Sequence, residues 1–143
     1  LDVNSEGLLL LTTDGKVSEY VRGRKVEKEY YVQVDGYIKQ EEINRLIKGV
    51  EIGFDGKKYI TKTCKSSLIS APFFKDRTQK IRDDRHGPTS WISITLTEGK
   101  FRQVRKMTAA VGFPTLRLIR VRIDTIMLEG LKPGEVKEVV RFF

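Results

Sequence analysis

Residues 90–123, SWISITLTEGKFRQVRKMTAAVGFPTLRLIRVRI, contain two strand patterns separated by one helix pattern, and they decide the fold class. Every second residue from Ile92 to Leu96 is large and apolar, which predicts a strand with one buried face. Residues 100–112 then predict a helix that ends in glycine, and residues 115–123 predict another strand. A strand, a helix and a strand in succession indicate an α+β domain.

The remaining segments add strands and short helices to this unit. Tyr30, Val32 and Val34 alternate within KEYYVQVDG, which predicts a half-buried strand. The four leucines of GLLLLTTDG predict a buried strand that ends in a turn at Asp14–Gly15. We also expect helices within 16–21 and 39–50, strands and a hairpin turn within 50–70, a long basic loop over 71–90, and a strand with a turn after residue 124. Together these patterns predict one domain over residues 1–143, of α+β class, with a mixed, largely antiparallel sheet and flanking helices.

The composition excludes several classes of protein and favours a polyanionic partner. The formal net charge is +8, and such an excess suggests nucleic acid as the partner. No apolar run approaches the roughly 20 residues of a membrane-spanning helix. Cys64 is the only cysteine and His86 the only histidine, so we expect neither a disulfide nor a metal site. These features favour a cytoplasmic protein in which Cys64 is a packing residue.

Basic residues gather on the predicted helix and on the strand that follows it. On the helix, three of them lie at helical spacing, opposite an apolar face. In the strand TLRLIRVRI the apolar parity changes after Leu118, which predicts a bulge that turns arginines outward. Each guanidinium can grip two phosphate oxygens, so the two segments predict a surface for RNA. The residues concerned are Arg102, Arg105, Lys106, Arg117, Arg120 and Arg122.

Three stretches, in this order, carry a family resemblance. They are LDVNSEGLLLLTTDG at residues 1–15, KEYYV at 28–32 and EGKFRQVRKMTAAVGFPTLRLIRVRI at 98–123. Together they resemble the ribosomal RNA pseudouridine synthases of the small-subunit synthase A type, and the third stretch is most similar to the large-subunit synthase E branch. The resemblance implies that a uridine of large-subunit ribosomal RNA is isomerised to pseudouridine.

The resemblance also implies roles for individual residues. Asp2 would be the catalytic carboxylate, Arg105 would pair with it, and Tyr30 would pack on the uracil. Lys28 opens the motif Lys-x-Tyr-x-Val, and Gln103 lies two residues before the pairing arginine. Because uridine is detached, turned over and rejoined through C5, the reaction is redox-neutral, and no cofactor or metal is implied. Asp2 could attack C1′ or C6 or remove the 2′ proton, and the sequence does not choose among these routes. The residues expected to contact RNA are Lys28, Arg102, Gln103, Lys106, Arg117, Arg120 and Arg122.

Three features depart from the family pattern. The arginine that usually precedes the first motif, an upstream strand and a small RNA-binding module are not in the chain, so we expect an N-terminally truncated catalytic domain. Phe101 stands where asparagine is common, and its side chain cannot hydrogen-bond RNA. Asp124 stands where glycine is usual, so we expect a different turn there.

Two other functions can be set against the enzyme. A module that binds ribosomal RNA without chemistry would use the same basic surface but would not need Asp2 or Tyr30. A hydrolase that uses Asp2 is disfavoured because the resemblance assigns no second catalytic carboxylate or histidine to accompany it. We therefore favour the enzyme, as a monomer with large-subunit ribosomal RNA as its partner.

Overall fold

The structure of this protein is a computed structural model that describes residues 4–23, 25–72, 87–137 and 139. Its strands are β1 (Glu6–Gly7), β2 (Lys28–Asp35), β3 (Glu51–Phe54), β4 (Lys57–Ile60), β5 (Lys65–Ile69), β6 (Thr89–Leu96), β7 (Thr115–Ile123) and β8 (Ile126–Met127). Its helices are α1 (Gly15–Arg22), α2 (Gln40–Lys48) and α3 (Gln103–Ala110). None of the helices in the described part is long and apolar enough to cross a membrane.

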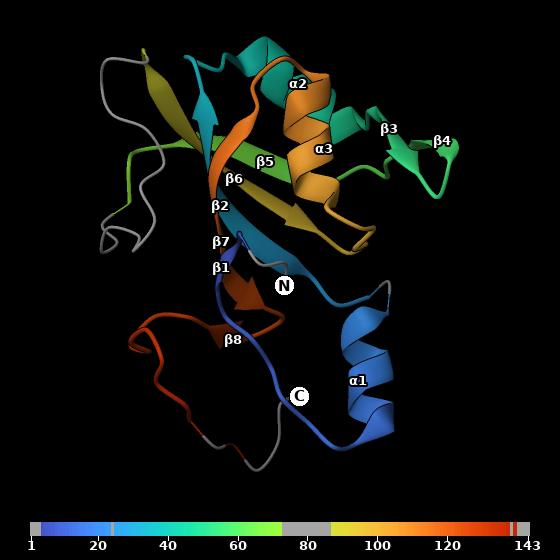
Figure 1. The fold of residues 1–143 in the computed structure, drawn as a ribbon, viewed down its shortest axis with the longest axis vertical. Helices are drawn as coiled ribbons and strands as arrows, with labels where there is room; N and C mark the ends of the chain where they lie inside the picture. The colour runs from blue at the N-terminus through green and yellow to red at the C-terminus, as the bar shows by residue number, and fades with distance from the viewer. Residues whose placement is uncertain (1–3, 24, 73–86, 138, 140–143) are drawn as a thin grey trace.

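One mixed sheet organises the fold (Figure 1). Its strand order is β1-β7-β2-β6-β5, with β8 also beside β7, and β3 and β4 form a separate hairpin. β1 runs parallel to β7, whereas β2, β5, β6, β7 and β8 pair in antiparallel fashion. The predicted α+β class with a mixed, largely antiparallel sheet is therefore confirmed.

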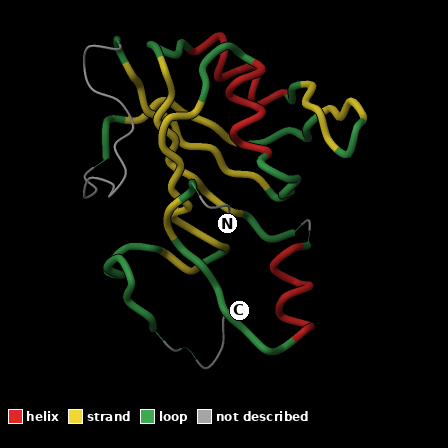
Figure 2. The backbone as a smooth tube through the Cα atoms, viewed as in Figure 1, coloured by secondary structure: helices red, strands yellow, loops and turns green. Residues whose placement is uncertain are grey.

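The main core lies between this sheet and the two helices α2 and α3. Both helices lie on the same side of the strands (Figure 2). The alternation predicted for β2 and β6 is confirmed, because the alternate residues of both strands face this core. Its side chains with at most 1% of their surface exposed are Val32, Val34, Ile43, Leu46, Ile92, Ile94 and Met107.

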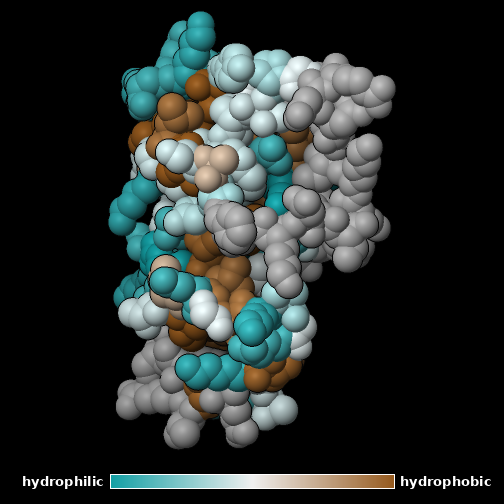
Figure 3. Space-filling view, turned by 90° about the vertical axis from the view of Figure 1, so that its left-hand side faces the viewer, coloured by the Kyte–Doolittle hydropathy of each residue, from teal (hydrophilic) through white to brown (hydrophobic). Residues whose placement is uncertain are grey.

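A second, smaller cluster is built around Trp91, Ile119 and Val121. Figure 3 shows the face that lies on the left-hand side of Figure 1, where hydrophobic residues (brown) lie between hydrophilic ones (teal). Leu118 belongs to the main core while its neighbour Ile119 belongs to the second cluster, so both faces of β7 are buried at this point.

The sequence predicts a bulge in β7 directly after Leu118, but the register is regular there, with Leu118 opposite Val32 and Ile119 opposite Tyr31. The register shifts lie on either side, between Glu29 and Tyr30 and between Gln33 and Val34. Glu29 of β2 lies opposite Arg122, but the next residue, Tyr30, lies opposite Arg120. Val121 is therefore the extra residue of β7, and it turns Arg120 to the Tyr30 position.

The prediction of a strand over Leu8–Leu11 is wrong. Only residues 6–7 pair with β7; Leu8 is buried, but Leu9 and Leu11 are 57% and 72% exposed. The reason is competition for the edge of β7, because β8 pairs with Arg122 and blocks a longer β1. The chain then leads into α1, where Asp14 is the N-cap and accepts a hydrogen bond from the Lys16 N–H at 2.9 Å.

Helix α3 begins later than the sequence pattern predicts. Arg102 precedes the helix with φ of 52°, so the predicted face of Arg102, Arg105 and Lys106 does not lie wholly on the helix. The Gln103 side chain explains the turn, since its Oε1 accepts from the Lys100 N–H at 3.0 Å. The helix ends before Gly112, as predicted to within two residues.

Three single-residue expectations have different outcomes. Cys64 packs against the main core, as predicted, and burial raises the pKa of its thiol to about 11. Asp124 has φ of 52°, so the position where glycine is usual takes a left-handed conformation here with aspartate. The predicted long loop falls largely on residues 73–86. These residues, His86 among them, lie outside the part of the chain that the structure describes.

Candidate active site

Arg105 of α3 lies against the segment that follows Asp2. Its Nη2 donates to the carbonyl oxygen of Asn4 at 3.0 Å and to the Ser5 hydroxyl at 3.2 Å. The two segments are about a hundred residues apart in the sequence, and the fold brings them together. Asp2 lies outside the described residues, so its pairing with Arg105 stays a prediction.

Two arginines of β7 hold the next residues of the same segment. Nε and Nη2 of Arg117 donate to the two carboxylate oxygens of Glu6, each at 2.8 Å. Nε of Arg120 donates to the carbonyl oxygen of Leu8 at 2.8 Å, and the Leu8 N–H donates back to the Arg120 carbonyl. Arg105, Arg117 and Arg120 thus fix residues 4–8, whereas the sequence assigns the latter two to RNA.

Gly7 lets this segment approach β7 closely. Its φ is 108°, and a Cβ at this position would lie 2.2 Å from the carbonyl oxygen of Arg120. No side chain fits there without moving the backbone of β1 or β7. The N-terminal segment is therefore fixed by backbone packing as well as by side chains.

Tyr30 lies on β2, which is separated from this segment by β7. It is opposite Arg120 on β7 and Ile94 on β6, and its ring packs against the main core while part of it stays exposed. Lys28 shares its strand face two residues earlier. Tyr30 and Lys28 are therefore on the side of β2 that Arg120 also faces.

Lys28 is a cation in an unfavourable environment. Its side chain is 7% exposed, and burial together with the nearby charge of Arg120 lowers the pKa of its ammonium group. A buried lysine with a lowered pKa loses its proton at a lower pH than an exposed lysine does. Positive charge is thus concentrated beside the segment that carries Asp2, where it can stabilise an anion.

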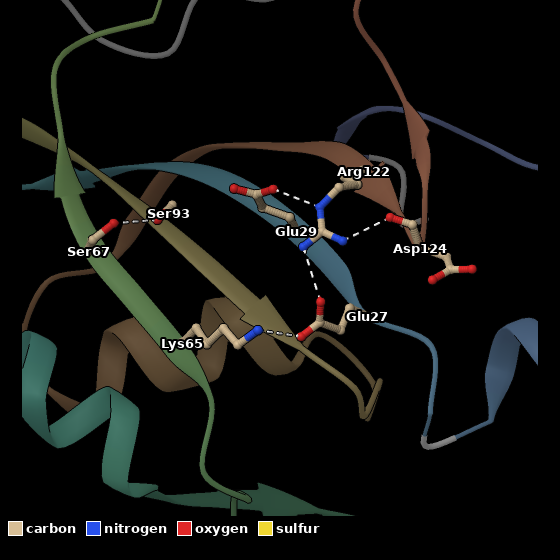
Figure 4. A network of polar contacts seen from close by, with 7 residues as sticks. All are labelled: Glu27, Glu29, Lys65, Ser67, Ser93, Arg122 and Asp124. Carbon is tan, nitrogen blue, oxygen red and sulfur yellow. Dashed lines mark hydrogen bonds and ion pairs between the residues drawn. The ribbon is translucent and has the colours of Figure 1, made fainter.

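Arg122 lies away from this arrangement, in a network of carboxylates (Figure 4). Its Nε donates to Glu29 at 3.0 Å, Nη2 lies 3.4 Å from Glu27, and Nη1 donates to the Asp124 carbonyl at 2.8 Å. The hydrogen bond with Glu29 is the main reason that the pKa of Arg122 is raised. Lys65 adds a second cation to Glu27 at 2.9 Å, so these charges neutralise one another within the protein.

The residues predicted on α3 also separate into different environments. Gln103 is 3% exposed, and its Nε2 donates to Glu98 at 2.8 Å, so its amide serves the protein interior rather than a surface for RNA. Lys106 lies with its Nζ 5.3 Å from the centre of the Phe101 ring, which is 68% exposed. Phe101 therefore orients a cation at the position where a polar residue is common.

Sequence reasoning missed the two carboxylates that organise this region, Glu6 and Glu98. Glu6 pairs with an arginine 111 residues away, and Glu98 accepts hydrogen bonds from Tyr59, Gln103 and the Lys62 N–H. No local periodicity links such positions; the only signal is a glutamate beside glycine in each of two motifs. Among the described residues no group of three or more His, Cys, Asp or Glu side chains could hold a metal ion.

Comparison with known proteins places this geometry in a family. The family model described as RNA pseudouridylate synthase matches residues 1–110. Ribosomal large subunit pseudouridine synthase E of Vibrio parahaemolyticus is 43% identical over 141 residues, covering 97% of this chain and 58% of that protein. The protein of the same name from Xanthomonas campestris is 40% identical over 137 residues, covering 94% of this chain and 72% of that protein.

A solved structure agrees with the sequence comparison. The crystal structure of a pseudouridylate synthase is similar with a TM-score of 0.66 and 30% identity, over 90% of this chain and 48% of that chain. The chain thus spans somewhat more than half the length of the Vibrio relative. The resemblance found in the three motifs is confirmed, and the chain belongs to the RNA pseudouridylate synthase family.

Proposed function

We propose that this chain is the catalytic domain of an enzyme that isomerises a uridine of large-subunit ribosomal RNA to pseudouridine. The observation that carries the proposal is the contact of Arg105 with Asn4 and Ser5, two and three residues after Asp2. The names of the relatives from Vibrio and Xanthomonas, ribosomal large subunit pseudouridine synthase E, support the choice of substrate.

Asp2 is the proposed catalytic carboxylate, and it must be ionised. A guanidinium within a few ångströms favours the charged form of a carboxyl group and fixes its direction. Arg105 is suited to this, because its own position is set by Asn4 and Ser5. Arg117 and Arg120 act as positioning residues, since they hold Glu6 and Leu8 of the same segment.

The reaction needs no external electron or proton source. The bond between N1 of uracil and C1′ breaks, the base turns over, and C5 bonds to C1′ while C5 loses its proton and N1 gains one. Whether the carboxylate attacks C1′ or C6 or removes the 2′ proton stays open. Tyr30, with its partly exposed ring on the sheet, is the proposed stacking partner of the uracil. Stacking repays part of the few kcal/mol that it costs to take a base out of its helix.

The proposed partner is ribosomal RNA, bound by a monomer in the cytoplasm. Lys28, Arg102 and Lys106 remain proposed RNA contacts. Arg117, Arg120, Arg122 and Gln103 are already engaged within the protein, and we give them structural roles instead.

Replacement of the proposed catalytic carboxylate tests the function. The protein is incubated with large-subunit ribosomal RNA that lacks the modification, and pseudouridine is mapped along the RNA. Asp2→Asn is expected to lower the rate by at least about a thousandfold, as loss of an essential group does. Asp55→Asn makes the same chemical change in the exposed turn between β3 and β4 and is expected to leave the rate unchanged.

The outcomes separate the enzyme from the binding module. RNA that binds tightly but gains no pseudouridine, with no effect of Asp2→Asn on anything measured, supports a module without chemistry. A full rate with Asp2→Asn contradicts the proposed role of Asp2.

A further inference from the structure

A pocket of about 180 Å³ lies outside the candidate active site. It is lined by residues from the end of α1, from β4 and the residues after it, and from the turn between β6 and α3. Neither Tyr30 nor Arg105 lines it. Three cations from these three elements do, and we call Arg22, Lys62 and Lys100 the pocket cations.

The pocket is close to the active site along the sheet. One of the residues that line it, Thr97, directly follows the last residue of β6. The last residue of β6, Leu96, pairs with Lys28, and Tyr30 is only two residues further along β2. Because a strand rises about 3.3 Å per residue, the pocket is within a few residue lengths of Tyr30.

The one carboxylate in the pocket is occupied by the protein. Oε1 of Glu98 accepts from the Lys62 N–H and from Gln103, each at 2.8 Å, and Oε2 accepts from the Tyr59 hydroxyl. Burial raises the pKa of Glu98, but these hydrogen bonds and the charge of Lys100 together lower it by more. The pKa of Glu98 is therefore below its ordinary value. Glu98 therefore stays ionised and directs both oxygens toward protein donors.

The pocket cations are not neutralised by close ion pairs. Within the described part of the chain, no carboxylate lies within ion-pair distance of Arg22, Lys62 or Lys100. Nζ of Lys100 is held 5.0 Å from the centre of the Phe54 ring and 5.2 Å from that of Tyr59. Both rings belong to the hairpin of β3 and β4, so the hairpin positions this cation over the pocket.

We propose that this pocket binds a backbone phosphate of the RNA substrate near the uridine that is modified. Three cations against one occupied carboxylate leave a surplus of two positive charges for an anion. The volume is below that of ordinary ligand pockets, which indicates a single small group rather than a base. Lysine and arginine are the usual donors to phosphate oxygens. The inference rests on the proposed function for the identity of the RNA.

The test measures the affinity for RNA at several salt concentrations. Arg22 and Lys62 are exposed, so Arg22→Gln, Lys62→Gln and their combination remove charge without disturbing the core. The probe is a fluorescent transcript of large-subunit ribosomal RNA. The double variant is expected to bind about tenfold more weakly, with a salt slope (log association constant against log salt) smaller in magnitude by about 1–2. Lys62→Arg should restore most of the affinity lost in Lys62→Gln.

A matched control and a kinetic readout complete the test. Lys132→Gln removes one charge from an exposed residue outside the pocket and should change affinity less than Lys62→Gln. With saturating RNA the pocket variants should keep kcat and raise KM. Equal salt slopes for wild type and the double variant overturn the proposal. A second outcome also overturns it: calorimetry shows that the protein binds inorganic phosphate, and Lys62→Gln abolishes this binding without changing the affinity for RNA. The pocket would then bind free phosphate and not RNA.

The result does not depend on whether pseudouridine forms. If the pocket variants lose affinity and slope but no modified base appears with wild-type protein, the pocket stands and the proposed function fails. If pseudouridine appears and the double variant binds as wild type does, the function stands and the pocket proposal fails.

Discussion

The β7 arginines (Arg117, Arg120 and Arg122) and the pocket cations differ in what surrounds them. Each β7 arginine donates to a carboxylate or a carbonyl of its own chain, in two of the three cases with ion-pair geometry. Lys100 faces aromatic rings instead, and Lys62 faces solvent. Arg22 is also exposed, although its Nε donates to the Ser18 carbonyl oxygen at 3.3 Å. Basic residues that are close together in the sequence can therefore all bind groups of their own chain, whereas cations from separate segments can form the surface that is available to RNA.

The difference has an energetic reason. A guanidinium that must leave a carboxylate to bind a phosphate loses one charge-assisted interaction as it gains another, so the net gain is small. A cation that faces water or a ring loses much less when it binds a phosphate. We therefore expect the pocket cations to contribute more to RNA affinity than Arg117 or Arg122.

Among variants of the β7 arginines, Arg117→Gln should have the strongest effect. Arg117 is 11% exposed on its side chain and bonds both oxygens of Glu6, so the variant leaves a carboxylate without its cation. Loss of a mostly buried pair should lower the free energy of unfolding by about 1–3 kcal/mol, measured by urea denaturation, less than a fully buried pair costs. It should also cut kcat about a hundredfold, because a catalytic segment displaced by about an ångström loses that much.

Glu6→Gln is the control that separates positioning from RNA binding. It removes a negative charge and should not weaken RNA binding, yet it is expected to lower kcat as Arg117→Gln does. The double variant should cost less than the sum of the two single changes. A rise in KM with unchanged kcat for Arg117→Gln, and no effect of Glu6→Gln, would place Arg117 on the RNA instead.

The sequence predicts the elements of this fold well where burial is periodic. The alternation in residues 28–35 and 89–96 and the apolar spacing before Gly49 correspond to β2, β6 and α2. The leucine run failed because a hydrophobic stretch reports burial but not pairing. Whether β1 extends depends on β8, which is more than a hundred residues away and takes the same edge of β7.

The candidate site could be predicted only in part. The motifs lead to Tyr30 and Arg105, and the fold brings Arg105 to the segment that carries Asp2. They do not reveal that Glu6 and Leu8 bind two β7 arginines. The alternation of residues along a strand shows which side chains point away from the core, but not whether solvent or another segment of the chain lies there. The pocket cations come from three separate elements, so no single stretch of sequence could indicate them.

Lys28→Met tests a cation that is more deeply buried than the β7 arginines and that lies near another cation, Arg120. Its lowered pKa means that charging Lys28 costs free energy in the folded state, fully at pH values below the folded pKa and less as the pH rises toward the unfolded value of 10.5. The variant should therefore be more stable by about 1 kcal/mol at pH 7, because replacing a buried charge by an apolar group of similar volume is often stabilising.

Urea denaturation at pH 7 and near pH 10 checks this, with the exposed Lys132→Met as the control. The gain of Lys28→Met over wild type should shrink at the higher pH, whereas Lys132→Met should show no such trend. A gain that is the same at both pH values would mean that packing, and not charge, limits stability at this position.

The smallest expected effect is that of Arg122→Gln. Arg122 is 22% exposed and shares Glu27 with Lys65, so its loss leaves Glu27 with a cation and should cost at most about 1 kcal/mol of unfolding free energy. The salt slope of RNA binding should stay that of wild type, because Arg122 contributes no uncompensated charge. If Arg122→Gln instead lowers the slope as much as Lys62→Gln does, the ion pairs with Glu27 and Glu29 open when RNA binds. The β7 arginines then belong to the same RNA surface as the pocket cations, and pairing within the free protein is no guide to the charges that RNA uses.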